Sequence, residues 1–225
     1  FHTINVTAFD VNGNSTVGQI NLEVREEIFP TVITKDIEVV LDADGKASIV
    51  PEDVNDGTFD NCSFTISLDT TEFTCANVGN NVVNLTATDN HGLTSTSQAN
   101  VLIIDNTPPT VLTQDISIDL DTSGNASITT SLIDNGSSDA CGIKSYMLNI
   151  SSFNCSNVGV NEVVLTVTDN NGNTSTETAN VTVNDVTAPI VVTQDISINL
   201  DANGSAIITP DMIDNNSTDS CGIES

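Results

Sequence analysis

The stretch that decides the fold runs from Pro109 to Ile133 and reads PTVLTQDISIDLDTSGNASITTSLI. Nearly the same stretch begins at Pro30 as PTVITKDIEVVLDADGKASIVPEDV and at Pro189 as PIVVTQDISINLDANGSAIITPDMI. Other landmarks keep the same period of 79 to 80 residues, among them Cys62, Cys141 and Cys221. Self-similarity at a fixed period indicates a repeat architecture in which each copy is one structural unit.

The period divides the chain into four segments. We predict that residues 1–29 are the C-terminal part of one repeat and that residues 30–108 and 109–188 are two complete repeats. Residues 189–225 are then the N-terminal half of a truncated repeat.

Within each repeat the pattern is that of strands and turns. In NEVVLTVTD (161–169), Val163, Leu165 and Val167 share one face, as the period of two requires for a half-buried strand. VVNLTATD (82–89) places Val83, Leu85 and Ala87 inward in the same way. About seven short strands with a turn every 8 to 12 residues are typical of an immunoglobulin-like sandwich. We therefore predict an all-β chain of tandem immunoglobulin-like β-sandwich repeats in an elongated array.

Composition excludes several classes of function. The 225 residues carry 31 Asp plus Glu against 4 Lys plus Arg, a formal net charge of −27. Such a chain repels nucleic acid and anionic lipid, and no apolar run approaches the roughly 20 residues of a membrane span. We predict neither a nucleic-acid partner nor direct membrane insertion.

A catalytic site is not predicted. His91 occupies a turn position at which the other repeats have Asn12 and Asn171. A catalytic histidine would be expected to recur at this position in the other repeats. No His lies within a plausible triad with a Ser or Cys, and no Gly-rich phosphate loop is found. The sequence thus predicts a protein that is not an enzyme.

The cysteines recur in pairs. Cys62 and Cys75 enclose 12 residues and Cys141 and Cys155 enclose 13, so each pair is predicted to close a hairpin as a disulfide. Zinc is the alternative, but neither CxxC nor HxxxH spacing accompanies them. Cys221 would find its mate about 13 residues further on. Persistent disulfides imply an oxidising location, at the cell surface or otherwise extracellular.

Several motifs together resemble a known family. They are a T-x-x-P opening, a DNxxSDACG or FDNC loop, an F-x-C-x-x-V-G turn, a T-x-T-D-x-x-G strand end and a closing D-x-T-x-P. The combination resembles the HYR and HYR-like repeats of giant bacterial surface adhesins, most of all the gliding-motility adhesins exported by the type 9 secretion system. The resemblance implies cell adhesion. One departure is that this chain has Thr34, Thr113 and Thr193, with Ser97 and Glu177, where the family often has a second cysteine pair.

Acidic loops are predicted to gather at each junction between repeats and to tie the first and last strands. Several carboxylates brought together repel one another unless a hard cation such as Ca²⁺ lies between them. The alternative is that these side chains serve only their own turns. The predicted ligands are, at the first junction, Glu26, Asp60 and Asp89; at the second, Asp105, Asp134, Asp139 and Asp169; at the third, Asp185, Asp214 and Asp219.

Two functions follow from these patterns. The first is a stalk, in which each repeat binds its neighbours in the same chain and the array holds a distal adhesive region away from the cell. The second is a calcium-dependent glycan-binding module, which would need aromatic platforms, yet Tyr146 is alone in its class. The sequence favours the stalk, with the surface or glycan ligand of the full protein unknown.

Overall fold

A computed structural model describes residues 2–224. Its residues cluster into two compact units. The first comprises residues 1–41 and 46–104, and the second comprises residues 42–45 and 105–225. Among the described residues, no helix is long and apolar enough to cross a membrane.

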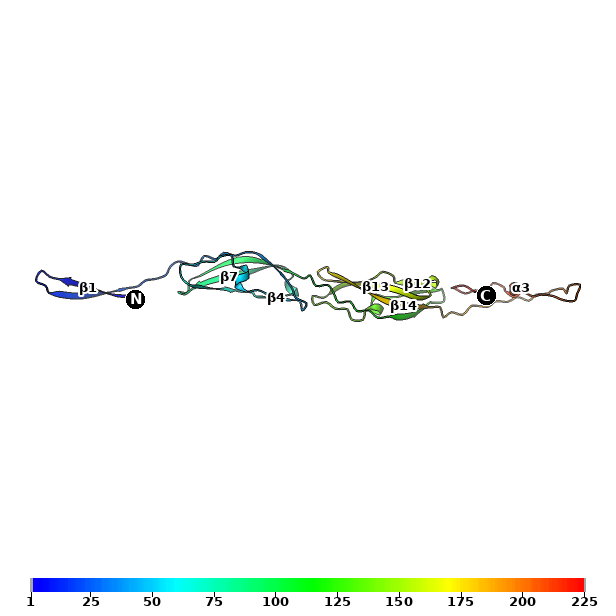
Figure 1. The fold of residues 1–225 in the computed structure, drawn as a ribbon. Helices are drawn as coiled ribbons and strands as arrows, with labels where there is room; N and C mark the ends of the chain where they lie inside the picture. Colours follow the sequence, from blue (N-terminus) through cyan, green and yellow to red (C-terminus); the bar gives the residue numbers. More distant parts are fainter. Residues whose placement is uncertain (1, 225) are drawn as a thin grey trace. The chain divides into compact units, whose positions relative to one another are not determined.

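The first unit holds a hairpin and one complete repeat (Figure 1). The hairpin joins β1 (His2–Phe9) to β2 (Ser15–Leu22) in antiparallel register. The repeat has a four-stranded sheet in the order β3 (Ile37–Val40), β8 (Thr94–Ile104), β7 (Gly79–Asp89), β5 (Phe64–Leu68). Its second sheet pairs β4 (Lys46–Ser48) with β6 (Glu72–Thr74).

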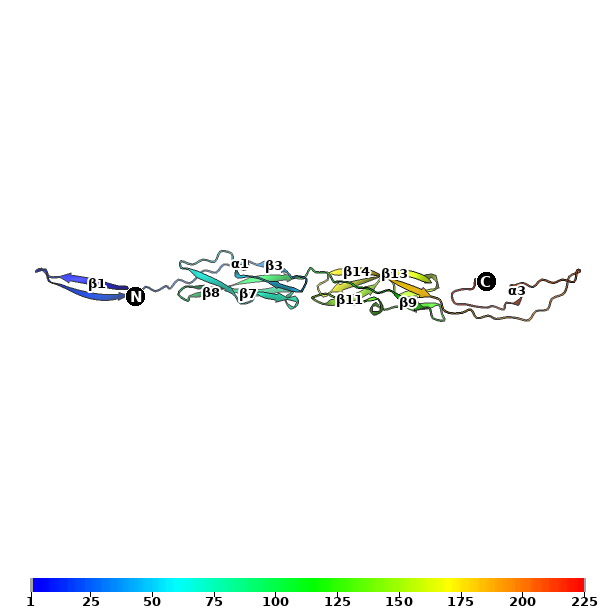
Figure 2. The same ribbon diagram turned by 60° about the horizontal axis from the view of Figure 1, so that its bottom comes forward.

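The second unit repeats this topology (Figure 2). Its four-stranded sheet has the order β11 (Ile143–Leu148), β13 (Gly159–Asp169), β14 (Thr174–Asn184), β9 (Ile116–Asp119). The second sheet pairs β10 (Asn125–Ser127) with β12 (Ser152–Asn154). The chain is thus nearly all β with two-layered, sandwich-like sheets, as predicted.

Each complete repeat has six strands among the described residues rather than about seven. A single helical turn, α1 (Pro51–Val54) or α2 (Thr130–Ile133), follows the second strand, and a 3-10 turn, η1 (Cys75–Asn77) or η2 (Cys155–Asn157), precedes the long hairpin. The same single turn, α3 (Pro210–Ile213), recurs near the end of the chain. One turn of helix is too short to give a helical period, so the sequence pattern did not reveal it.

The core lies where the alternation predicts. Val83, Leu85 and Ala87 of β7 are fully buried, and so are their counterparts in β13, Val163, Leu165 and Val167. Phe73 and Phe153, from the short strands of the second sheet, close each core from the opposite side. The predicted inward faces of these strands are therefore confirmed.

Residues 189–224 keep the repeat's turns without its strands. Thr193 bridges Asp214 as Thr113 bridges Asp134, but no described residue of this segment belongs to a strand. Leu200 is 69% exposed, whereas Leu120, its counterpart in the complete repeat, is 3% exposed.

The first and last strands of a repeat are held by backbone pairing, by hydroxyl groups and by the carboxylates of Asp36 and Asp115, which accept the Asn100 and Asn180 amides, each at 2.7 Å. Strand β3 runs parallel to β8, and β9 runs parallel to β14. The Thr34 hydroxyl donates to the Gln98 carbonyl at 2.6 Å and lies 3.2 Å from the Ser97 hydroxyl. Thr34 and Ser97 are the positions where the resembling family often has cysteines, so a polar contact stands where the second disulfide would be.

The predicted hairpin disulfides are wrong. Cys155 is bonded to Cys221, with a Cα–Cα distance of 5.1 Å, and Cys62 is a free thiol. Cys75 and Cys141 are each disulfide-bonded. The prediction failed because the strands beside each cysteine pair do not form a hairpin: β5 pairs with β7 while β6 pairs with β4, and β11 and β12 diverge in the same way.

Candidate cation sites

The candidate sites begin where the inward-facing row of a long strand ends in an acid. Asp89 is the last residue of β7 and is 5% exposed, and Asp169 is the last residue of β13 and is fully buried. Each uses Oδ1 to accept backbone N–H groups of the following turn. The turn geometry therefore fixes these carboxylates at the end of the core.

The first group lies in the first unit around Glu26. Ligand atoms of Glu26, Cys62 and His91 all lie within 4.8 Å of one another. Asp60 Oδ2 accepts the Cys62 amide at 3.1 Å, while its Oδ1 is buried without a hydrogen-bond partner. Asp89 Oδ2 is likewise buried and unpartnered. The three acids predicted for this junction thus converge on one thiol.

The pKa values of this group agree with that placement. The pKa of the Cys62 thiol is raised, first by its hydrogen bond to Glu26 and then by burial and by the charges of Glu26, Asp60 and Asp89. The pKa of Glu26 is lowered because the Ile28 amide and then the Cys62 thiol donate to its carboxylate. Two buried carboxylate oxygens still lack a positive partner.

The second group lies in the second unit. Ligand atoms of Asp105, Asp139 and Cys141 lie within 4.8 Å of one another, although a disulfide sulfur is a poor ligand. Asp105 is 6% exposed; its Oδ1 accepts the Thr107 amide at 3.0 Å and its Oδ2 is buried without a partner. Asp139 Oδ1 accepts the Cys141 amide at 2.8 Å.

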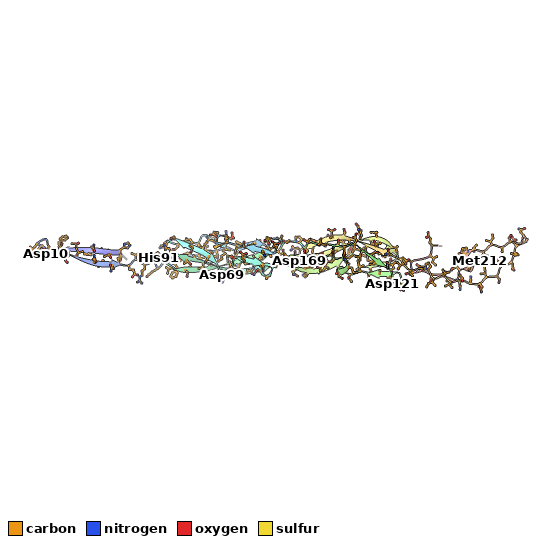
Figure 3. The ribbon with its side chains drawn as sticks, turned by 90° about the horizontal axis from the view of Figure 1, so that it is seen from below. Asp10, Asp69, His91, Asp121, Asp169 and Met212 are labelled. Atoms are coloured by element: carbon orange, nitrogen blue, oxygen red, sulfur yellow. A yellow bond between two sulfur atoms is a disulfide. The ribbon has the colours of Figure 1, made fainter. Side chains whose placement is uncertain are left out.

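Asp169, labelled in Figure 3, is satisfied within its own turn. Asn173 Nδ2 donates to Asp169 Oδ2 at 2.8 Å and also to the Asp105 carbonyl at 3.1 Å. Burial alone would raise the pKa of Asp169, but hydrogen bonds from the Asn173 side chain and the turn amides outweigh it and lower the pKa. The first repeat has Leu93 at the position of Asn173, which is why Asp89 Oδ2 is left unpartnered.

The third group repeats the pattern of the second. Ligand atoms of Asp185, Asp219 and Cys221 lie within 4.8 Å of one another. Asp219 Oδ1 accepts the Cys221 amide at 2.8 Å, and its Oδ2 is buried and unpartnered. Asp185 is exposed and accepts the Thr187 amide at 3.0 Å.

Asp134 and Asp214 are not brought into these groups. Each accepts a turn amide, from Ser137 and Ser217 respectively, at 3.1 Å. Asn55 makes the corresponding contact with Thr58 in the first repeat, so the position needs a side-chain oxygen rather than a charge. Conversely, His91 is an exposed turn residue, as the sequence indicates, and yet its ring lies within reach of Glu26.

The chemistry of these donors suits a hard cation. The unpartnered oxygens are carboxylate oxygens, which Ca²⁺ prefers. In each of these acids the other carboxylate oxygen accepts a backbone N–H, which fixes the side chain in place. Several such oxygens occur because the same loop and turn recur in each repeat. The donors present therefore fit Ca²⁺.

Comparison with known proteins adds little to these findings. No family model and no curated protein matches the chain. One similar solved structure is protocadherin gammaB7 EC3-6, with 18% sequence identity and a TM-score of 0.36; the match covers 92% of this chain and 63% of that chain. Another is human mucin-like protocadherin EC1-2, with 15% sequence identity and a TM-score of 0.37; the match covers 70% of this chain and 99% of that chain. Sidekick-1 immunoglobulin domains 1-4 are similar too, with 10% sequence identity and a TM-score of 0.39; the match covers 80% of this chain and 57% of that chain. This chain thus spans under two thirds of the first and third of these.

These similarities are too weak to carry an argument, and the fold assignment stands on the two-layered sheets themselves. The immunoglobulin-like class is therefore defined by topology. The resemblance to HYR-like adhesin repeats, with gliding motility and type 9 secretion, stays a prediction.

Proposed function

We propose that the chain is part of an extracellular adhesin stalk, in which repeated β-sandwich domains hold a distal adhesive region away from the cell surface. The observation that carries this proposal is recurrence: a closing acid and the loop cysteine come together in three places, one for each boundary in the repeat period, and the loop acid joins them in the second and third. Chemistry that recurs with every copy serves the array rather than a single site. The role proposed is structural and non-catalytic.

The cysteines support the extracellular part of the proposal. Four of the five cysteines are disulfide-bonded, and such bonds persist in oxidising environments. The strongly acidic surface supports it further, since a net charge of −27 keeps neighbouring copies of the chain apart. Gliding motility and type 9 secretion belong to the proposal through the motif resemblance alone.

Ca²⁺ is the cation that we propose for the three acidic groups. Binding there would neutralise the carboxylates of a closing acid and a following loop at once, so the ion would fix one repeat against the next. Extracellular modules bind Ca²⁺ with dissociation constants of about 0.1 to 1 mM. Such affinity would keep the sites filled only where Ca²⁺ is plentiful.

The test is thermal unfolding of the whole chain with Ca²⁺ and with chelator. At 10 mM Ca²⁺ the ion is at roughly 10 to 100 times its dissociation constant, which stabilises by about 1.4 to 2.7 kcal/mol. For domains of this size we expect a midpoint higher by roughly 5 to 20 °C. Hydrogen exchange, read separately for each repeat, assigns the change to its site.

Two substitutions make this test specific. Asp105→Asn removes a buried ligand of the second group and is expected to abolish the Ca²⁺ response of the second repeat. Glu162→Gln removes the same charge from an exposed position on β13 and is expected to leave the response intact. Equal melting with Ca²⁺ and with chelator would rule out the ion while leaving the repeat fold unaffected.

Leu93→Asn tests the origin of the unpartnered oxygen of Asp89. An asparagine there is expected to donate to Asp89 Oδ2 as Asn173 donates to Asp169, and to reduce the Ca²⁺-induced rise of the first repeat by at least half. The added hydrogen bond changes the stability of the ion-free repeat by no more than about 1.5 kcal/mol. Leu93→Met, which preserves volume, is the control. A full Ca²⁺ response in Leu93→Asn would exclude Asp89 as a ligand.

The glycan-binding alternative is tested directly on a glycan array. Tyr146 is 39% exposed and no other aromatic accompanies it as a platform on the described part of its strand. We expect no reproducible binding with or without Ca²⁺. Binding that requires Ca²⁺ would favour the glycan module over the stalk.

A further inference from the structure

The Cys155–Cys221 disulfide joins two successive repeats. Cys155 is the cysteine of the F-x-C motif and directly follows β12 of the second repeat, and Cys221 lies in the DSCG loop of the next repeat, 66 residues later. A bond between repeats differs in kind from a bond within one, because it constrains the junction as well as the domain.

The junction is shaped to hold this bond. The Cys221 amide is fixed by Asp219 Oδ1, so the loop acid of the candidate cation site also sets the position of the cysteine. On the other side, a Cβ at Gly124 would lie 2.7 Å from Cys155 Sγ, closer than side-chain atoms approach in proteins. Gly124 also has a φ of +76°, which favours glycine. The turn between β9 and β10 therefore leaves room for the disulfide.

The same positions recur earlier in the chain. Cys75 and Cys141 stand 80 residues before Cys155 and Cys221, and both are disulfide-bonded. Cys62 occupies the loop position of Cys141 and Cys221, and Asp60 holds its amide as Asp139 and Asp219 hold theirs. Among the three loop cysteines, Cys62 has a free thiol, and it is the one that no F-x-C cysteine precedes in the 225 residues.

The two cysteines of one repeat lie at its opposite ends. Gly142, next to Cys141, accepts a hydrogen bond from Asn170, just beyond the end of β13. Cys155 instead lies beside Gly124 and precedes Gly159, where β13 begins. Figure 3 shows the same separation, with Asp169 and Asp121 at opposite ends of this repeat. The segment from Cys141 to Cys155 therefore crosses the repeat once, through β11 and β12.

We propose that these disulfides are staples that carry tension along the array: the F-x-C cysteine of each repeat bonds the loop cysteine of the following repeat. Force entering at Cys141 then passes through the 141–155 segment and across to Cys221. Strands β13 and β14, which supply most of the core, lie inside the loop that the disulfide closes and bear no load. This deepens the stalk proposal, although neither test below depends on calcium.

The 141–155 segment, which carries the tension, can lengthen only a little. Fourteen residues span at most about 50 Å, and β11 and β12 are already extended. A repeat of 80 residues without staples could be drawn out to roughly 260 to 290 Å. Stapling therefore limits the lengthening of the stalk when a repeat unfolds.

Peptide mapping tests the pairing. The native chain is alkylated without reduction and then cut after Lys144 and before Asp139, Asp169 and Asp219, which separates Cys141, Cys155 and Cys221. We expect the label on Cys62 and a disulfide between peptides 145–168 and 219–225. The same map identifies the partners of Cys75 and Cys141. A label on Cys221, with Cys141 bonded to Cys155, would overturn the proposal and restore bonds within single repeats.

Single-molecule pulling on the two ends of the chain tests the mechanics. In the double variant Cys155→Ser with Cys221→Ser, the gain in contour length on unfolding is expected to increase by roughly 220 to 240 Å, the length of the 66 released residues. Cys62→Ser is the matched control and should leave the gain unchanged. If the double variant folds poorly, reductant added to the native chain should release at least this length, because it also opens the disulfide bonding of Cys75 and Cys141. An equal gain with and without reductant would overturn the staple.

Discussion

Replacing Phe153 with alanine is expected to destabilise the second repeat by about 3 to 5 kcal/mol. Phe153 is 3% exposed and closes the core formed by Leu165, Val167 and Val181. A small domain has a total stability of only about 5 to 15 kcal/mol, and this repeat has no tryptophan to enlarge its core. The loss is therefore a large part of the total. Urea unfolding followed by circular dichroism measures it.

Met147→Ala is the matched control for Phe153→Ala. Met147 lies in β11 of the same repeat and is 64% exposed, so its truncation should cost less than about 0.5 kcal/mol. Hydrogen exchange should show protection lost across β13 and β14 in Phe153→Ala and retained across β7 and β8. Similar costs for the two variants would mean that Phe153 does not close the core of the second repeat.

Asp169→Ala is expected to cost the second repeat roughly 2 to 5 kcal/mol in the absence of Ca²⁺. The carboxylate is fully buried and accepts the amides of Asn171, Gly172 and Asn173. Its loss removes three backbone hydrogen bonds to a charged group at a buried position, and hydrogen bonds to charged groups contribute about 1.5 to 3 kcal/mol each. Urea unfolding with chelator present isolates this cost from any effect of calcium.

The effect of Asp169→Ala should depend on pH in a defined direction. The pKa of Asp169 is lowered in the folded repeat, so its contribution is fully present above its unfolded pKa of about 3.9 and is lost as the pH falls through the folded value. The difference between the native chain and Asp169→Ala should therefore shrink in acid. A difference that grows below pH 4 would contradict this assignment.

Asp121→Ala is the control for burial. Asp121 accepts the amides of Ser123 and Asn125 in a turn of the same type, but it is exposed, so water replaces the lost contacts. We expect a cost below about 1 kcal/mol. If both aspartates cost the same, turn chemistry alone would explain the acidic positions.

The sequence predicted the strands and the inward faces because a half-buried strand imposes its period of two directly on the chain. Val163, Leu165 and Val167 are buried as that period requires. The convergence of Glu26, Asp60 and Asp89 followed from strand direction and the repeat, since strands that alternate in direction return their loops to the same end. Asp134 accepts the Ser137 amide in its own turn, and its place among the junction acids stays a prediction, because an Asx turn and a cation ligand have the same residue type.

Only the tertiary structure decided which cysteines meet. The spacing of Cys141 and Cys155 in the sequence predicted a disulfide between them. In the structure β11 and β12 belong to different sheets, and the two sulfurs lie at opposite ends of the repeat. Likewise, PIVVTQDISINL repeats the pattern of residues 109–120 and yet forms no strand in residues 189–200. Strand pairing depends on two segments that lie far apart in the sequence. A local pattern therefore indicates which segments are able to pair, and only the assembled fold determines which of them pair.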